Sequence, residues 1–341
     1  MNDVRLAVVG VGLIGRRHVE AIHRSAGVTL AAIVDPDHRT REVADVPWFP
    51  TLAELPAGSV DGVILATPNG MHVDGGLASI AMGLPVLVEK PLATDVAGAR
   101  RLVDVAEAHG VAILTGHHRR HNPLIAAAKS MIDSGEIGRV VSAQAMFWLR
   151  KPDDYFDVEW RRQPGGGPVF INLIHDIDLL RHLVGEITAV QAITSNTVRG
   201  FDVEDTAVIV FEFESGALGT ANVSDAIAAP WSWELTSGEN PVYSQTDQAC
   251  YLLGGDMGSL ELPRLRVWSH ADGGGWYDPI ETRHGSYEEA DPLVRQVENF
   301  AAVIRGEVAP LVSGREGLNT LAVIGAITAS ARLRRRVEIG G

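Results

Sequence analysis

Three glycines near the N-terminus constrain the fold of this 341-residue chain more than any other feature. Gly10, Gly12 and Gly15 follow an apolar run at residues 5–9 and precede a helical pattern. In this setting the first glycine permits a tight turn, the second lets a ligand approach the backbone, and the third lets the helix pack close to the strand. Free N–H groups at such a helix N-terminus bind phosphate. The spacing therefore predicts a strand–loop–helix unit that holds a pyrophosphate.

An acidic residue follows at the position where a dinucleotide site needs one. A second apolar run, residues 30–34, ends in Asp35, twenty residues after Gly15. An acid here accepts hydrogen bonds from ribose hydroxyls, and its charge repels a 2′-phosphate. The next two residues are proline and aspartate, not an arginine that would bind such a phosphate. We therefore expect NAD as the cofactor, with Leu13 and Ile14 in the binding loop. A glycine-rich turn without a cofactor is the alternative.

Length and composition limit the class of protein. A chain of 341 residues exceeds the usual size of a single core, so we expect two domains. Hydrophobic residues make up 46% of the sequence, no apolar run is long enough to span a bilayer, and the N-terminus shows no signal-peptide pattern. The net charge of −14 argues against binding to nucleic acid or an anionic membrane. The single cysteine, Cys250, excludes an intrachain disulfide and fits a cytoplasmic protein.

The N-terminal part of the chain alternates between strand and helix patterns. Beyond the opening unit, apolar strands are predicted at residues 60–66, 85–89 and 111–115, separated by helices at about 71–82 and 95–109. Near-continuous apolar strands between amphipathic helices are typical of a doubly wound parallel sheet. Ligands of such a sheet bind beyond the carboxyl ends of the strands. We therefore predict an α/β dinucleotide-binding domain over residues 1–121.

The pattern changes near Pro123 and becomes rich in β-structure. Alternation of Val208 and Val210 with Ile209 and Phe211 favours antiparallel strands with one solvated face. Strands are predicted at about residues 139–149, 189–198, 206–213, 217–223, 232–237, 259–262 and 265–268. Helices are predicted at about residues 124–134, 291–305 and 314–334, with another before residue 189. Residues 122–341 would thus form an α+β domain with a mainly antiparallel sheet.

Glu89, Lys90 and Pro91 stand at the end of a predicted buried strand. The proline removes a backbone donor and favours an extended conformation at Lys90. Burial, together with a positive nicotinamide nearby, would lower the pKa of such a lysine. Its amine could then bind a substrate hydroxyl and help to remove the proton. The alternative is an ordinary strand-end lysine paired with Glu89.

A second candidate group follows a run of glycines. Gly165–Gly167 give a flexible approach to a predicted helix on which His175 and Asp178 share one face. A histidine on such a face can move a proton near neutral pH. A buried histidine that only caps or bridges is the alternative.

Two further clusters carry polar or aromatic side chains. His117, His118 and His121 lie close together but lack cysteine or carboxylate neighbours at a zinc-like spacing, so we predict no metal site. His118 follows a strand end, where it could line a cleft. Trp231 and Trp233 could stack on a sugar ring, or they could simply pack on the sheet.

Together these segments resemble the Gfo/Idh/MocA oxidoreductase family, over nearly the whole chain. The residues that carry the resemblance are Gly10–Gly15 with Asp35, Ala66–Asn69 with His72, Glu89–Pro91, Gly116 with Arg119, Arg120 and Pro123, Trp160 with Arg161, Gly165–Gly167 with His175, and Glu204–Thr206. The resemblance implies an N-terminal Rossmann domain that binds NAD or NADP. It also implies a C-terminal α+β domain whose large open sheet forms the substrate cleft and commonly the interface of a homodimer or homotetramer.

The resemblance assigns roles by position. Lys90 matches the family's active-site lysine, and His175 matches its active-site histidine. The residues expected to hold the cofactor are Thr67, Pro68, Asn69, His72, Glu89, Lys90, Trp160 and Arg161. The residues expected near the substrate are His118, Arg119, Asn172, Trp231 and Trp233.

One position departs from the family pattern. Many members carry an aspartate four residues before the histidine, where this chain has Ile171. An isoleucine cannot orient an imidazole or exchange a proton. Either Asn172 takes over substrate binding, or catalysis rests on Lys90 and His175.

The resulting hypothesis is an NAD-dependent dehydrogenase that oxidises a secondary alcohol of a sugar, a cyclitol or a sugar derivative. Lys90 and His175 would bind the hydroxyl and remove its proton, while Arg161 or Asn172 would hold other oxygens. Oxidation of a cis-dihydrodiol ring is the enzymatic alternative, because Ile171 replaces the usual acid. A non-catalytic NAD sensor is a third hypothesis, which the presence of both Lys90 and His175 disfavours.

Overall fold

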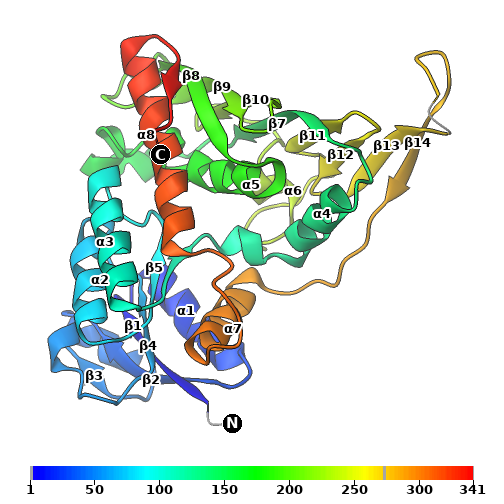
Figure 1. Ribbon diagram of the computed structural model, residues 1–341. Helices are drawn as coiled ribbons and strands as arrows, with labels where there is room; N and C mark the ends of the chain where they lie inside the picture. Colours follow the sequence, from blue (N-terminus) through cyan, green and yellow to red (C-terminus); the bar gives the residue numbers. More distant parts are fainter. Residues whose placement is uncertain (1–2, 272–273, 341) are drawn as a thin grey trace. The chain divides into compact units, whose positions relative to one another are not determined.

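The computed structural model describes residues 3–271 and 274–340 and divides into two compact units (Figure 1). The first unit combines the chain up to Asn122 with Ala290–Leu321, and the second combines Pro123–Glu289 with the chain from Ala322 onward. A single boundary after residue 121 differs from this division in one respect. It leaves out the return of Ala290–Leu321 to the first unit.

The first unit contains a six-stranded sheet in the order β3-β2-β1-β4-β5-β6. Its strands are β1 (Val4–Val9), β2 (Val28–Val34), β3 (Trp48–Phe49), β4 (Gly62–Leu65), β5 (Val86–Glu89) and β6 (Ile113–Gly116). Every neighbouring pair is parallel. From β1 the chain first adds strands on one side, β2 and β3, and then adds β4, β5 and β6 on the other. The carboxyl ends of β1 and β4 therefore lie where the order of strands reverses, which is the usual ligand position of such a sheet. The predicted doubly wound parallel sheet is confirmed.

Helices cover both faces of this sheet. They are α1 (Leu13–Arg24), α2 (His72–Ala81), α3 (Val96–His109), α7 (Pro292–Ile304) and the first part of α8 (Gly314–Leu333). Buried side chains of α1 and α7 join one core with Leu6, Val8 and Ile33 of the sheet. Helices α2 and α3 pack together on the other side, as Figure 1 shows. Asp95 and Asp291 cap α3 and α7 by accepting hydrogen bonds from backbone N–H groups of the first turn.

The second unit contains a nine-stranded sheet in the order β14-β13-β12-β11-β7-β10-β9-β8-β15. The strands are β7 (Val140–Trp148), β8 (Ile187–Ser195), β9 (Thr206–Phe213), β10 (Leu218–Ser224), β11 (Tyr251–Gly255), β12 (Ser259–Leu262), β13 (Arg266–His270), β14 (Ile280–His284) and β15 (Val337–Glu338). Only the β7–β10 pair is parallel, so the sheet is mixed but mainly antiparallel. This agrees with the predicted fold class.

One face of the second sheet carries the core of its unit. Helices α4 (Pro123–Asp133) and α5 (Ile174–Val184), with the last part of α8, pack against inward side chains such as Ile209 and Phe211. The alternate residues of β9, Val208 and Val210, are 47% and 46% exposed. This alternation follows from the two-residue period of a strand, and it leaves the opposite face of the sheet open among the described residues.

The structure corrects the prediction at several elements. Residues 232–237, predicted as a strand, contain a helical turn, α6 (Trp233–Thr236), because the Ser232 side chain accepts a hydrogen bond from the Leu235 N–H as an N-cap. Strands β3, β11, β14 and β15 lie outside the predicted set. Within the described residues, no helix combines the length and the apolar character that crossing a bilayer requires.

Candidate active site

The glycine loop between β1 and α1 forms because side chains are absent where the backbone crowds. Gly10 has a φ of +83°, and a Cβ there would stand 2.8 Å from the carbonyl oxygen of Ala66. A Cβ on Gly15 would stand only 1.9 Å from the carbonyl oxygen of Gly10. Both residues are therefore needed for α1 to begin this close to the end of β1.

Gly12 differs from these two glycines, because a Cβ added there would meet nothing within 4 Å. Gly12 is the N-cap of α1 and has no side chain to cap the helix. The next residue, Leu13, is 87% exposed. The backbone N–H groups of Leu13 and Ile14 therefore stand at a helix N-terminus beside open space, an arrangement that suits a diphosphate. This loop fits the pyrophosphate of NAD.

Asp35 follows β2 and holds the glycine loop. One carboxylate oxygen accepts a hydrogen bond from the Val11 N–H at 2.7 Å, and the other accepts one from the Asp37 N–H at 2.8 Å. Each oxygen of an ionised carboxylate has two lone pairs, so Asp35 keeps acceptor capacity for ribose hydroxyls. The acid thus joins the phosphate loop to the segment that follows β2.

The loop after β4 carries Thr67, Pro68 and Asn69, and His72 ties it to the loop after β5. The two ring nitrogens of His72 lie 2.9 Å from the Thr67 carbonyl oxygen and 2.8 Å from the Pro91 carbonyl oxygen. His72 is fully buried, so it holds these two loops together from within the unit. The Thr67 hydroxyl is buried without a hydrogen-bond partner in the described part of the chain, which leaves it available to a ligand.

Glu89 ends β5 as a buried carboxylate with a partner that the sequence analysis missed. Its Oε1 atom lies 2.7 Å from Nε2 of His18 on α1, and its Oε2 atom accepts the Lys90 backbone N–H at 3.1 Å. Burial raises the pKa of Glu89, but the His18 hydrogen bond and the positive charges of His18, His118 and Lys90 outweigh it and hold the pKa at about 2. Glu89 is therefore an anion that accepts a hydrogen bond from the backbone of Lys90.

The strand beside Glu89 leaves room for this carboxylate. Gly116 pairs with Glu89 across β5 and β6, and a Cβ on Gly116 would stand 2.9 Å from the carboxyl carbon. The short helix η4 (His118–His121) follows; His118 is partly buried and Arg119 is buried. Among residues 3–271 and 274–340, no group of three or more His, Cys, Asp or Glu side chains could hold a metal ion.

In the second unit, His175 lies at the start of α5, directly after a π-helical turn, η7 (Val169–Leu173). Wide turns of this kind are frequent at functional sites. Glu204 accepts a hydrogen bond from the Val169 N–H at 3.1 Å, and burial raises the pKa of Glu204. A Cβ on Gly167 would stand 2.3 Å from the same Glu204 oxygen, so the glycine run lets the acid reach the helix start.

The wide turn also carries Ile171 and Asn172. Both residues are partly buried. The side-chain oxygen of Asn172 is buried and has no hydrogen-bond partner among the described residues. An unsatisfied amide oxygen one helical turn before His175 is an acceptor suited to a substrate hydroxyl.

Trp160 and Arg161 lie on a short helix, η6 (Glu159–Arg162), of the second unit. The Arg161 guanidinium stacks 4.0 Å from the ring centre of Tyr155 and donates to the Tyr155 carbonyl oxygen at 2.7 Å. Trp160 is 48% exposed. The backbone of this helix packs under Gly166, whose Cβ would stand 2.5 Å from the Trp160 carbonyl oxygen.

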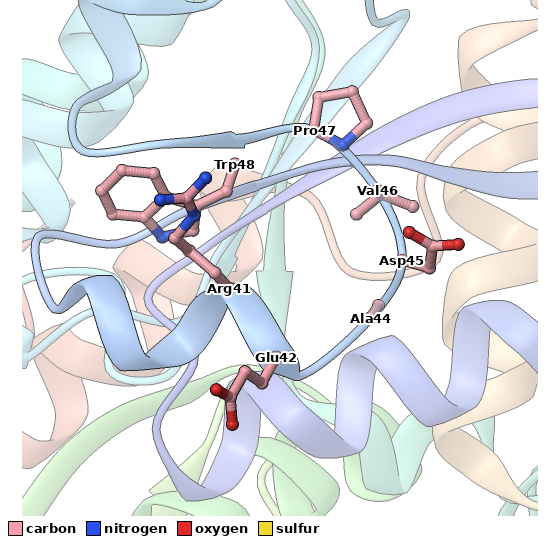
Figure 2. A pocket seen from close by; sticks show the side chains of 7 residues that line it. All are labelled: Arg41, Glu42, Ala44, Asp45, Val46, Pro47 and Trp48. Atoms are coloured by element: carbon pink, nitrogen blue, oxygen red, sulfur yellow. The ribbon is translucent and has the colours of Figure 1, made fainter.

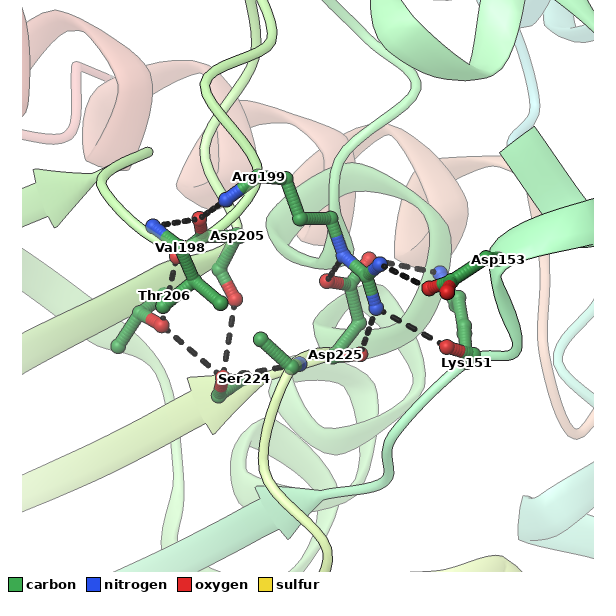
Figure 3. A network of polar contacts seen from close by, with 9 residues as sticks. Lys151, Asp153, Val198, Arg199, Asp205, Thr206, Ser224 and Asp225 are labelled. Carbon is green, nitrogen blue, oxygen red and sulfur yellow. Dashed lines mark hydrogen bonds and ion pairs between the residues drawn. The ribbon is translucent and has the colours of Figure 1, made fainter. Parts of the chain in front are cut away.

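The sequence analysis also missed a buried charge network in the second unit, because its members come from three distant segments (Figure 3). Arg199 donates to a carboxylate oxygen of Asp225 at 3.2 Å and to the carbonyl oxygens of Asp225 and Lys151. The Lys151 ammonium lies 3.4 Å from Asp225. Burial lowers the pKa of Lys151 and raises that of Asp225, although each charge opposes the shift of the other. The network fixes the loops at the carboxyl ends of β7 and β10.

The two candidate tryptophans have different surroundings. Trp233 is 2% exposed, packs in the core beside Tyr251, and donates its indole N–H to Glu239. This placement matches the packing alternative for Trp233. Trp231 is partly buried and contacts Trp148 edge to face, with 5.5 Å between ring centres.

The structure thus collects the predicted residues in two groups. The first unit brings the glycine loop, Asp35, the loop after β4 and Lys90 to the carboxyl edge of one sheet. The second unit holds Trp160, Arg161, Asn172 and His175.

Comparison with known proteins agrees with this geometry. Residues 4–117 match the family described as oxidoreductase family, NAD-binding Rossmann fold, and residues 125–240 match the GFO/IDH/MocA C-terminal domain. The chain belongs to the GFO/IDH/MocA oxidoreductase family. Its first unit is therefore an NAD-binding Rossmann domain, as the glycine loop and Asp35 predict.

Members of the GFO/IDH/MocA family align over different lengths of the chain. The rhizopine catabolism protein MocA of Rhizobium meliloti is 35% identical over an alignment of 203 residues, which covers 58% of this chain and 62% of that protein, less than two thirds of its length. The scyllo-inositol 2-dehydrogenase (NAD(+)) of Bacillus subtilis (strain 168) is 27% identical over an alignment of 351 residues, which covers 99% of this chain and 97% of that protein.

A solved structure shows the same fold over the whole chain. The crystal structure of an oxidoreductase from Agrobacterium radiobacter, in complex with NAD+, L-tartaric acid and magnesium, has a TM-score of 0.84 and 21% identity, and 99% of each chain is covered.

The glycine loop generates a paired prediction. Gly15→Ala should lower the unfolding temperature by on the order of 5 °C or more, because the new Cβ collides with the Gly10 carbonyl. Gly12→Ala should lower the unfolding temperature by only about 2 °C, because alanine is a poorer N-cap than glycine but meets no neighbour. It should weaken NAD+ binding about tenfold or more, because its methyl group occupies the space of the diphosphate. Thermal unfolding and calorimetry measure both. Equal effects of the two variants on NAD+ affinity and on stability would contradict this assignment.

The Glu89–His18 pair generates a prediction about pH. Because the pKa of Glu89 is about 2 in the folded protein, below its ordinary value of 4.5, its contribution to stability is complete above about pH 4.5 and is lost as the pH falls toward 2. Glu89→Gln should therefore flatten the fall in unfolding free energy from pH 5 to 3 by up to about 1.4 kcal/mol per pH unit. His18→Gln should flatten it in the same direction. Urea unfolding at several pH values tests this, and unchanged slopes in both variants would exclude the pair as the cause.

Proposed function

We propose that this protein is an NAD-dependent dehydrogenase that oxidises a secondary alcohol of a polyhydroxylated ring, a cyclitol or a sugar. The family assignment supports an oxidoreductase that uses NAD. The Bacillus subtilis relative named scyllo-inositol 2-dehydrogenase (NAD(+)) aligns with nearly the whole chain and supports a cyclitol as the substrate class. The related Agrobacterium radiobacter structure holds NAD+.

The observation that carries the proposal is the position of Lys90. It follows β5 at the carboxyl edge of the Rossmann sheet, the same edge as Gly12 and the loop after β4. Its backbone is held by the Glu89 carboxylate, and the next residue is held through the bond between the Pro91 carbonyl and His72. A lysine placed by two buried side chains at the ligand edge of such a sheet is suited to act on a substrate.

The proposed reaction gives the cofactor and each side chain a separate role. When bound, NAD+ supplies the hydride acceptor at its nicotinamide ring. Lys90 binds the reacting hydroxyl and takes its proton, and the adjacent Glu89 anion offsets the positive charge that this site gathers. His175 is the second group proposed to hold or move a proton, at the start of a helix that Glu204 fixes.

Asn172 is the residue proposed to recognise a further hydroxyl. The residue directly before Asn172 is Ile171, which supplies no carboxylate. The unsatisfied side-chain oxygen of Asn172 accepts a hydrogen bond, and its NH₂ group donates one. A neutral amide suits a neutral polyol, which both donates and accepts.

We further propose that the open face of the nine-stranded sheet binds a second copy of the chain. The exposed side chains of this face include Ile193 on β8, Val208 and Val210 on β9, and Leu252 on β11. Strands β8 and β9 pair with Ile193 opposite Val208, so these two apolar side chains are neighbours. Leu252 lies in the same row as Val210, with Thr220 of β10 and Gln144 of β7 between them. A sheet face that mixes exposed apolar and polar side chains, and that no element of the described chain covers, is suited to association. The buried thiol of Cys250 is consistent with a cytoplasmic location, which we include in the proposal.

Lys90→Ala tests the proposed chemistry. Because general-base catalysis contributes about a hundredfold or more, turnover should fall by at least that factor while the NAD+ dissociation constant stays within about threefold of the wild type. NADH absorbance with a panel of inositols, aldoses and cis-dihydrodiols gives both the substrate class and the rate. Near-normal turnover by the variant would remove Lys90 from the chemistry, and turnover only on cis-dihydrodiols would reject the cyclitol and sugar assignment.

Charge on the open sheet face tests the association. Val208→Arg with Val210→Arg should shift the molar mass in light scattering from a multiple of the chain mass toward the chain mass, since buried unpaired charges oppose contact. The matched control is Val242→Arg, because Val242 is 85% exposed and lies outside the sheet. A monomeric wild-type protein, or an assembly that survives the double variant, would refute the proposed interface.

A further inference from the structure

An arginine does follow the ribose-binding acid, but the structure engages it with a second acid. Arg39 stands four residues after Asp35, on the short helix η1 (His38–Glu42). Its Nε atom lies 2.9 Å from both carboxylate oxygens of Asp37, and its NH2 atom lies 2.6 Å from Oδ2. This bidentate pair directs the guanidinium to Asp37.

The pair is directly linked to Asp35. The Asp37 N–H donates to Asp35 Oδ1 at 2.8 Å, so the backbone of Asp37 is in contact with the acid assigned to the adenosine ribose. Asp37 also accepts the Arg39 N–H at 3.0 Å and thereby caps η1. The Arg39 hydrogen bonds hold the pKa of Asp37 at about 2, so the carboxylate is charged throughout the neutral range.

An arginine close to the ribose-binding acid can bind a 2′-phosphate in place of a carboxylate. Dinucleotide sites that accept NADP place an arginine near the ribose, where it binds the 2′-phosphate. Arg39, on the first helical turn after β2, carries the charge that this role needs. In this chain its charge is matched by Asp37, and a 2′-phosphate would face the carboxylates of both Asp35 and Asp37.

We propose that Asp37 is a second determinant of cofactor specificity, which engages Arg39 and so excludes a 2′-phosphorylated adenosine nucleotide. The proposal rests on the placement of the adenosine ribose at Asp35 within the proposed function. Neutralising Asp37 releases Arg39 toward the 2′ position. Because the pair is solvent exposed, it adds little to stability, and its effect is on discrimination between NAD+ and NADP+.

Arg41 on the same short helix provides the matched control. Its guanidinium lies over the Trp48 ring, 5.4 Å from the ring centre. Figure 2 shows it in the pocket lined by Arg41, Glu42, Ala44, Asp45, Val46, Pro47 and Trp48, beside β3. Arg41 therefore has the same charge as Arg39 and a different partner.

The test is a set of variants whose binding is measured by calorimetry without any alcohol substrate. The variants are Asp37→Asn, Arg39→Gln, the Asp37→Asn/Arg39→Gln double variant, and Arg41→Gln. Asparagine keeps an oxygen that can accept the Arg39 N–H, so the cap of η1 is preserved. Each protein is titrated with NAD+, NADP+ and 2′,5′-ADP, and thermal unfolding checks the fold.

We expect a gain in NADP+ binding only in a variant that keeps Arg39. Asp37→Asn should improve the affinity for NADP+ relative to NAD+ about tenfold, the size of one charge contact near a protein surface, and should improve 2′,5′-ADP binding similarly. Arg39→Gln alone and Arg41→Gln should leave the ratio within about twofold of the wild type, and the double variant should lose the gain.

Two results would overturn the inference while NAD+ binding stays intact. One is an unchanged ratio in Asp37→Asn. The other is a gain that persists in the double variant, since it would then come from lost repulsion alone. If the folded wild-type protein bound no NAD+, the cofactor placement within the proposed function would itself be wrong, and this inference would fall with it.

Discussion

The contact between the start of α1 and the ends of β1 and β4 is the constraint on which the candidate site depends. It exists because Gly10 and Gly15 have no side chains, so the Gly10 carbonyl can stand where a Cβ of residue 15 would otherwise be. The close approach aims the first N–H groups of α1 at open space beside Gly12, and Asp35 fixes the loop through the Val11 N–H. A phosphate site of this kind needs no charged side chain, because the helix terminus supplies the donors.

Buried ion pairs and hydrogen bonds then position the residues proposed to react. Glu89 pairs with His18 and accepts a hydrogen bond from the backbone of Lys90. His72 links the loop after β4 to the loop after β5, which carries Lys90. In the second unit, Glu204 fixes the helix that carries His175. In each case a buried polar group is satisfied by a partner from a distant segment. Loss of one partner would leave the other buried without a hydrogen bond. A substitution at these positions should therefore both disorder the site and lower the stability of its unit.

The sequence predicted those parts of the fold that follow from local patterns. Near-continuous apolar strands between helices gave the parallel sheet, and the alternation around Ile209 gave the antiparallel one. The glycine spacing with Asp35 gave the NAD-binding domain, which the family match confirms. Strand β14 was missed because all of its residues are exposed and it therefore lacks an alternating pattern.

The remaining parts depend on tertiary contacts. His18 looks like any residue of an amphipathic helix until it meets Glu89, 71 positions later. The pairing of Arg199 with Asp225 joins two loops that no spacing rule connects. The return of residues 290–321 to the first unit is equally non-local, because α7 buries Phe300 against a core made largely by the first third of the chain. The assignment of Lys90 and His175 to one reaction stays a prediction.

The most direct test of the central claim is a crystal structure of the protein with NAD+. The account predicts the diphosphate within hydrogen-bond distance of the backbone N–H groups of Leu13 and Ile14, and the adenosine ribose hydroxyls on the carboxylate of Asp35. A dinucleotide bound away from α1, or a ribose with no contact to Asp35, would contradict it.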